Sequence, residues 1–239
     1  MSPKRLLLLS VSAGAGHMRA AEAIRAHADK LEASLCARHI DVMDYVPAGF
    51  RKLYTDFYLK LVSKAPALWG YLYQVTNEAK PDSATQRIRR AIERLNARAL
   101  LKEIAEFRPD AIVCTHFLPA EILFHQIRKD RLACPVWVQV TDFDLHRMWV
   151  IPRMTGYFAA NEEVAFRMQA HGIAAQTIRV TGIPIMPAFA QVPDRAECAR
   201  ELGLDPSRPT ILLMGGGAGI GSLETVAARL LELDGASGP

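Results

Sequence analysis

The sequence predicts an α/β protein built on a doubly wound, mainly parallel sheet. Apolar runs of strand length recur along the chain and alternate with segments of helical length. The runs are continuously apolar rather than alternating, which is typical of parallel strands that helices cover on both faces. The predicted strands are Leu6–Val11, His39–Met43, Ala111–Thr115, Val136–Thr141, Tyr157–Ala160, Thr177–Thr181 and Thr210–Met214.

The first predicted strand follows Lys4 and Arg5, a start that imitates a secretory signal peptide. Its apolar run is only about as long as a parallel strand and leads directly into a glycine turn, so we expect a strand. No apolar stretch of the sequence approaches the roughly 20 residues that a membrane-spanning helix needs. Membrane contact is therefore expected to be peripheral.

The turn Ser12–His17, with the sequence SAGAGH, joins that strand to a helical pattern over Met18–Leu35. Gly14 and Gly16 are expected to permit positive φ and close approach of a ligand, next to the unpaired N–H groups of a helix N-terminus. The dinucleotide-binding motif G-x-G-x-x-G/A fits poorly, because Arg19 occupies the position of its third small residue. A P-loop fits worse, because no Gly-Lys-Ser/Thr follows the turn. A plain turn with a solvated histidine remains the alternative.

An aromatic and basic stretch follows, from Phe50 to Gln74. Its apolar residues recur every three or four positions, which predicts an amphipathic helix with a break at Pro66. The next helical pattern, Ser83–Phe107, is rich in Arg and poor in acids. The aromatic stretch is either a helix packed on the domain or a hydrophobic groove or membrane-facing surface. The Arg-rich helix is either a solvated face or, beside the aromatic stretch, a contact for anionic lipid. In the membrane-facing interpretation, the membrane residues are Phe57, Tyr58 and Trp69.

Polar groups follow most of the predicted strands at the point where each strand ends. Because ligands of such sheets bind outside the carboxyl ends of the strands, these groups predict one site. The groups are Gly14–His17, Asp44, Thr115-His116, Thr141-Asp142 and Gly182.

Asp142, Asp144 and His146 have the spacing Asp-x-Asp-x-His, which could be taken for metal ligands. A fourth partner is missing, and alternate residues at a strand end face different ways, so we expect no metal. The isolated cysteines, Cys36, Cys114, Cys134 and Cys198, form neither a C-x-x-C pair nor a metal pattern. They predict reduced thiols and a cytoplasmic setting. The formal net charge of +4 suits an anionic lipid surface, a nucleotide or neither.

The proline-rich segment Pro184–Pro209 is typical of an interdomain connection and contains an amphipathic stretch, Arg195–Leu202. The predicted strand Thr210–Met214, a glycine loop and a helix over Ser222–Leu233 then begin a second α/β unit. The printed sequence is too short after this point for a second sheet, so we expect a truncated domain that is inactive in sugar transfer by itself.

Four segments resemble motifs of the diacylglycerol glycosyltransferases, the family of plant monogalactosyldiacylglycerol synthases and bacterial processive diacylglycerol glucosyltransferases. The most specific is Val140–Trp149, with the sequence VTDFDLHRMW. The others are the glycine turn with Ala20–Ile24, Pro109-Asp110 with Thr115–Phe117, and Val180–Ile185. In order and spacing they resemble the family from residue 5 to about residue 221.

The resemblance implies a GT-B glycosyltransferase that moves a hexose from a UDP-sugar to diacylglycerol with inversion. His17 would be the base that removes the proton of the acceptor hydroxyl, and Asp142 would orient the acceptor or His17. UDP-glucose or UDP-galactose is the implied donor substrate, with no cofactor, no metal and no nucleic acid. The chain would lie peripherally on the inner, cytoplasmic face of a membrane with an anionic surface.

The remaining expected site residues follow from the same resemblance, with core packing as the alternative for His116 and Trp149. The acceptor and cleft residues are Gly14, Gly16, Thr115, His116, Phe117, Thr141, Phe143, His146 and Trp149, and the donor-binding residues are Gly182, Gly215, Gly216, Gly217 and Gly219.

The predicted domains are residues 1–185, which bind acceptor and membrane in a Rossmann-like fold, the linker 186–208, and the start of the UDP-sugar domain at 209–239. Two other functions remain open. The chain could be a non-catalytic lipid-binding or membrane-surface module that keeps the acceptor half alone. It could also be another GT-B protein, such as a peptidoglycan N-acetylglucosaminyl transferase or a nucleotide-sugar epimerase.

Overall fold

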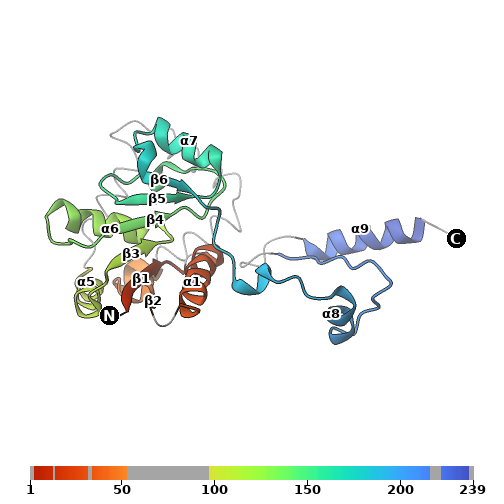
Figure 1. Ribbon diagram of the computed structural model, residues 1–239. Coiled ribbons are helices and arrows are strands. Elements are labelled where there is room, and N and C mark those ends of the chain that lie inside the picture. The colour runs from red at the N-terminus through yellow and green to blue at the C-terminus, as the bar shows by residue number, and fades with distance from the viewer. Residues whose placement is uncertain (1–2, 13, 32–33, 53–96, 216–221, 237–239) are drawn as a thin grey trace. The chain divides into compact units, whose positions relative to one another are not determined.

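The computed structural model describes residues 3–12, 14–31, 34–52, 97–215 and 222–236. The chain divides into two compact units, Met1–Pro187 and Ala188–Pro239. The first unit holds the sheet (Figure 1). The roles predicted for the two parts of the chain, acceptor binding and donor binding, remain predictions.

The described part of the first unit contains a parallel sheet of six strands in the order β2-β1-β3-β4-β5-β6. Every neighbouring pair is parallel; in the register, Leu8 of β1 lies opposite His39 of β2 and Val113 of β3. The predicted α/β class is therefore confirmed. The strands are β1 (Lys4–Ser10), β2 (Leu35–Asp41), β3 (Ala111–Cys114), β4 (Val136–Gln139), β5 (Gly156–Ala159) and β6 (Ile178–Val180).

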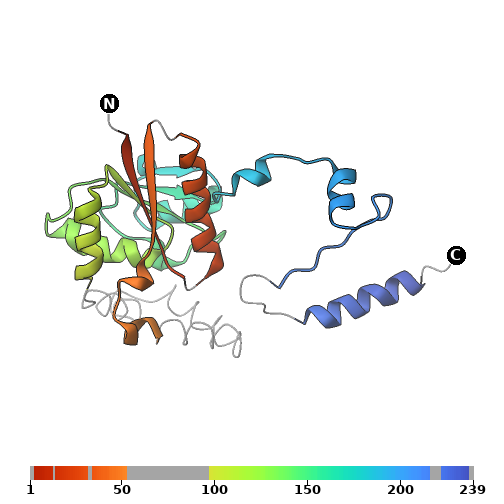
Figure 2. The same cartoon turned by 90° about the horizontal axis from the view of Figure 1, so that it is seen from below.

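Helices cover both faces of this sheet, as the continuously apolar strands predict. Alternate residues of β1 point to opposite faces, so Leu7 and Leu9 join one buried cluster and Leu8 joins another. Ala21 of α1 packs with Leu8, and α5 and α6 contribute to the other cluster. Figure 2 shows α1 and α5 on opposite sides of β1 and β2. In the described part of this unit, the helices with full bounds are α1 (Ala15–Asp29), α5 (Arg98–Phe107), α6 (Phe117–Arg128) and α7 (Glu162–Ala170).

Two predicted boundaries near the N-terminus are wrong. The sequence pattern predicts the first helix over Met18–Leu35, but α1 begins at Ala15 and ends at Asp29, and Leu35 already belongs to β2. The second predicted strand continues to Met43, but β2 ends at Asp41. There the Asp41 carboxylate accepts hydrogen bonds from the backbone N–H groups of Ser12 and Met43, which caps the 3-10 turn η1 (Val42–Asp44) and stops the strand.

The second unit contains α8 (Arg195–Glu201) and α9 (Leu223–Ala236), close to the two predicted helices. The predicted strand Thr210–Met214 is wrong, because residues 209–215 have no strand assignment. Ile211, Leu212 and Met214 are largely exposed there. A strand requires a neighbouring strand for its backbone hydrogen bonds, and the described residues of this unit supply none.

The predicted membrane residues Phe57, Tyr58 and Trp69 lie outside the described residues, as does the part of the basic helical pattern before Ala97. In the part of the chain that is described, no helix is both long and apolar enough to cross a membrane.

Candidate functional site

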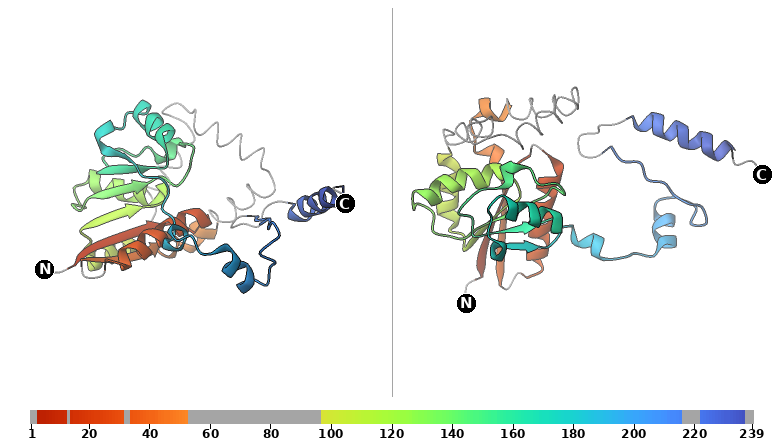
Figure 3. Two further views of the ribbon diagram at one scale, coloured as in Figure 1. Left: turned by 45° about the vertical axis from the view of Figure 1, so that its right-hand side comes forward. Right: turned by 90° about the horizontal axis from the view of Figure 1, so that it is seen from above.

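At the carboxyl edge of the sheet (Figure 3), His17 in the first turn of α1 contacts residues that follow β3 and β4. His17 Nδ1 lies 2.6 Å from the hydroxyl oxygen of Thr141, which follows β4. Thr115, which follows β3, donates its hydroxyl proton to the carbonyl oxygen of His17 over 2.9 Å. Three predicted site residues from separate parts of the sequence therefore lie in direct contact.

The glycines of the turn differ from expectation in their backbone conformation. Gly14 has φ −179°, an extended value open to any residue, and Gly16 lies within α1. The positive φ expected at both positions is therefore wrong. A Cβ atom added at Gly16 would meet nothing within 4 Å, so packing does not require glycine there. What Gly16 provides is open space one residue from His17.

The contacts of Thr141 fit one tautomer of the His17 ring, the one with its proton on Nδ1. Besides its contact with His17, the Thr141 hydroxyl lies 3.5 Å from the carbonyl oxygen of Thr115, to which it donates. Where the hydroxyl proton is directed to that carbonyl, the same oxygen accepts a proton from Nδ1 of His17. In that tautomer the lone pair of the neutral imidazole is on Nε2, where it can accept a proton.

Burial lowers the pKa of His17 below its ordinary value, while the Asp142 charge and a hydrogen bond with the backbone of Thr115 act in the opposite direction. The lowered pKa favours the neutral imidazole of His17 at pH 7. The nearby His116 is 3% exposed, and burial, together with the charge that His17 carries when it is protonated, holds its pKa well below 6.5. The two rings meet edge to face, with centroids 4.6 Å apart.

His116 also has a structural role that fits the packing alternative. Its Nδ1 accepts a hydrogen bond from the backbone N–H of Leu118 and caps α6. Phe117 packs against the His116 ring at 4.1 Å between centroids and against Trp149 at 5.9 Å. These aromatic rings form a buried wall beside His17.

Asp142 contacts Trp149 rather than His17. Its Oδ2 accepts the indole N–H of Trp149 over 2.7 Å, and Trp149 is 1% exposed. Trp149 is thus a core residue that also holds a site carboxylate. The influence of Asp142 on His17 is through its charge, which raises the histidine pKa.

The three residues with metal-like spacing have different partners. Asp142 contacts Trp149, and Asp144 forms an ion pair with Arg167 over 2.8 Å. His146 Nδ1 accepts the backbone N–H of Met148 at the start of the 3-10 turn η2 (Arg147–Trp149). Among the described residues, no group of three or more His, Cys, Asp or Glu side chains is arranged to hold a metal ion.

The predicted donor-binding glycines divide between the two units. Gly182, in the first, has φ +80°, a value that favours glycine, and its carbonyl oxygen accepts a hydrogen bond from Gln139 Nε2 over 3.1 Å. Gly215 belongs to the second unit, and Gly216, Gly217 and Gly219 lie outside the described residues.

Two residues that support the site were not predicted from the sequence. Gln139, the last residue of β4, links that strand to Gly182, and no local pattern marks it. Asn161 caps α7 through its side-chain oxygen. Its position directly before Glu162 and Glu163, after a predicted strand, is an N-cap signature that could have identified it.

Comparison with known proteins agrees with the motifs. The profile of the monogalactosyldiacylglycerol (MGDG) synthase family matches residues 17–185. The chain is 30% identical over 236 residues to monogalactosyldiacylglycerol synthase 1 of Arabidopsis thaliana, covering 96% of this chain and 43% of that protein. It is 30% identical over 121 residues to a processive diacylglycerol beta-glucosyltransferase of Staphylococcus epidermidis, covering 51% of this chain and 30% of that protein.

The chain therefore spans less than half the length of these curated relatives. Among solved structures, it is similar to UDP-GlcNAc 2-epimerase from Neisseria meningitidis, with a TM-score of 0.41, 16% identity, and coverage of 75% of this chain and 46% of that one. It is also similar to the lipopolysaccharide outer core galactosyltransferase WaaB, with a TM-score of 0.39, 12% identity, and coverage of 74% and 44%.

Proposed function

Because this chain belongs to the monogalactosyldiacylglycerol synthase family, we propose that it is the acceptor-binding part of a GT-B glycosyltransferase that makes a membrane glycolipid. The transfer proceeds from a UDP-sugar to diacylglycerol, with inversion at the anomeric carbon. The observation that carries the proposal is the placement of His17: Thr141 holds its Nδ1 at the carboxyl edge of the sheet.

In the proposed reaction, His17 Nε2 takes the proton of the glycerol hydroxyl as its oxygen attacks the anomeric carbon. The bond between that carbon and the UDP oxygen breaks, and UDP leaves with the electron pair. The imidazolium that forms is stabilised by the charge of Asp142, which favours the protonated ring. This single displacement inverts the anomeric centre and uses UDP-sugar as a substrate, with no cofactor.

Changing Asp142 to Asn tests the electrostatic part of this proposal. Asparagine keeps an oxygen acceptor for Trp149 but removes the charge that raises the pKa of His17. The pKa should therefore fall, and the acid limb of the rate profile should move to lower pH. Turnover on the plateau should fall roughly tenfold, because the imidazolium loses a favourable charge. The measurement is the pH dependence of kcat for glycolipid formation.

The matched control is Asp130→Asn, which makes the same chemical change at an exposed residue after α6. Its pH profile should overlay that of the unmodified protein. An unchanged acid limb in Asp142→Asn would contradict the electrostatic role while leaving His17 as a candidate base.

The donor is proposed to bind against Gly182 and the glycine loop Gly215, Gly216, Gly217 and Gly219. Backbone N–H groups of such a loop suit the diphosphate of UDP. The experiment that tests the function is thin-layer analysis of lipids formed from diacylglycerol with UDP-glucose or UDP-galactose, using a form of the protein with a complete donor-binding part. Diacylglycerol binding without transfer in that form would instead favour a lipid-binding module.

We further propose that the protein lies peripherally on the inner, cytoplasmic face of an anionic membrane. The sequence from Phe50 to Gln74 combines apolar and basic residues, so binding should weaken as salt rises. Replacing Phe57, Tyr58 and Trp69 together with Ser should abolish flotation of the chain with anionic liposomes. The control is flotation with uncharged liposomes. Unchanged flotation of the triple variant on anionic liposomes would favour helices packed on the domain.

A further inference from the structure

The segment after β4 carries both Thr141 and Asp142, and side chains fix its position. Val140 still pairs with β5, its N–H donating to the Phe158 carbonyl oxygen over 2.9 Å. The next residues are attached to other elements by side-chain contacts, from Thr141 to His17 and from Asp142 to Trp149. The distance between Thr141 and His17 therefore depends on the contacts that fix the position of this segment.

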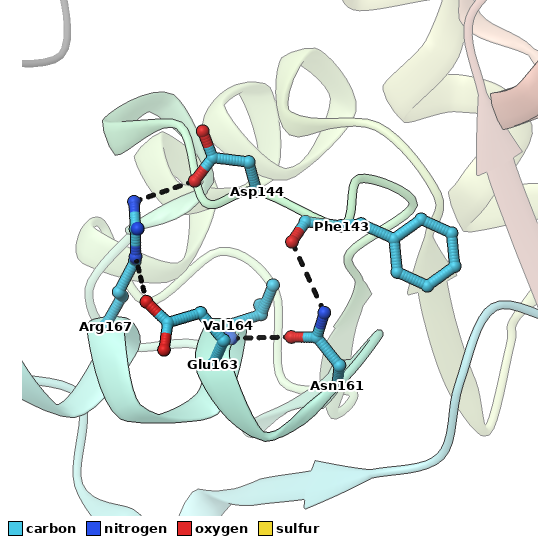
Figure 4. Close-up of polar contacts among 6 residues, drawn as sticks. All are labelled: Phe143, Asp144, Asn161, Glu163, Val164 and Arg167. Carbon is cyan, nitrogen blue, oxygen red and sulfur yellow. Dashed lines mark hydrogen bonds and ion pairs between the residues drawn. The ribbon is translucent and has the colours of Figure 1, made fainter.

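Asn161 joins the segment to the start of α7. Its Oδ1 accepts the backbone N–H of Val164 over 2.8 Å, and its Nδ2 donates to the carbonyl oxygen of Phe143 over 3.3 Å (Figure 4). The Phe143 ring points away from α7 and is 69% exposed, so this attachment acts on the backbone alone. Asparagine suits the position because its amide supplies an acceptor and a donor at once.

Arg167, further along α7, contacts the same segment through a side chain. Its guanidinium bridges Glu163 over 2.7 Å and Asp144 over 2.8 Å (Figure 4). The three side chains are between 44% and 60% exposed. Ion pairs this exposed contribute about 0–1 kcal/mol, and they act on the Asp144 side chain, whereas the Asn161 amide binds the backbone of the segment directly.

We propose that Asn161 is a positioning residue of the site: by binding the Phe143 carbonyl from the cap of α7, it holds Thr141 against His17. The Thr141–His17 contact is 2.6 Å, so a displacement of about 1 Å would lengthen it to roughly 3.6 Å, beyond hydrogen-bond range. The effect of losing the Asn161 contact on turnover rests on the proposed function, in which His17 is the base. The effect on the position of the His17 ring does not depend on that function.

Two variants separate the cap of α7 from the attachment to Phe143. Asn161→Ser and Asn161→Asp both keep an oxygen that caps a helix well, and neither retains the amide donor. The two replacements differ in charge, so an effect that both variants share is caused by loss of the amide N–H donor. In the 239-residue chain, the ring nitrogen NMR signals of His17 should move in both variants, while circular dichroism stays unchanged. In a transfer-competent form, kcat should fall roughly tenfold with the KM for UDP-sugar unchanged.

The matched control is Gln169→Ser, which removes an amide from an exposed position of the same helix. Its His17 signals should overlay those of the unmodified chain. If the His17 signals of both Asn161 variants also overlay them while α7 is intact, the positioning role is overturned and the proposed function is untouched. If they move but the unmodified protein with a complete donor-binding part makes no glycolipid, the positioning role stands and the proposed function fails.

Discussion

Changing His17 to Ala is expected to lower the rate of glycolipid synthesis by roughly 10²–10⁴-fold, the usual contribution of a general base. The imidazole removed is the one whose Nδ1 is held by Thr141 and whose pKa burial keeps low. The loss should appear in kcat, with the affinity for UDP-sugar nearly unchanged, because proton removal belongs to the chemical step. Initial rates at saturating UDP-sugar, in a form of the protein that supports transfer, measure it.

The control for this prediction is His171→Ala, an exposed histidine after α7 and before β6, at the edge of the sheet opposite the carboxyl ends. Its rate should match that of the unmodified protein. A fully active His17→Ala protein would remove His17 from the mechanism, whatever role the fold gives it.

Changing Gly156 to Ala is expected to destabilise the first unit by about 3 kcal/mol, the upper part of the range for overpacking a core. Gly156 lies opposite Trp137 in the β4–β5 ladder, and the indole occupies the space that a Cβ would fill. The added carbon would also lie 2.7 Å from the backbone carbonyl oxygen of Thr177, which cannot turn away as a side chain can. Urea unfolding followed by circular dichroism measures the loss.

The control is Gly16→Ala, where a Cβ meets nothing within 4 Å and the residue is helical. That change should leave stability unchanged or raise it by roughly 0.5–1 kcal/mol. The double variant Gly156→Ala with Trp137→Leu should recover only part of the loss, because the Thr177 carbonyl remains. A loss below about 1 kcal/mol in Gly156→Ala would show that the two strands can separate at little cost.

The sequence by itself determined the fold class and the location of the site at the strand ends. Strand-length apolar runs such as Leu6–Val11 predict a parallel sheet. A strand whose residues are apolar at every position needs helices on both faces of the sheet to bury them, and parallel sheets are covered in this way. The polar residues after those runs include His17, Thr115 and Thr141. Parallel strands run in one direction, so residues that follow them are expected at the same edge of the sheet. These inferences use patterns over a few neighbouring residues, so they do not require the tertiary structure.

Only the tertiary structure decided which side chains are partners. From the family resemblance, Asp142 is expected to orient either the acceptor or His17, yet the hydrogen bond of His17 is with Thr141, 124 residues away in sequence, and Asp142 binds Trp149. Asn161 is tied to the site by one contact with a loop 18 residues earlier. The prediction of a strand at Thr210–Met214 is wrong for a related reason: a strand forms its backbone hydrogen bonds only with a neighbouring strand. Which partner a group finds depends on how the elements pack, and no local pattern encodes that.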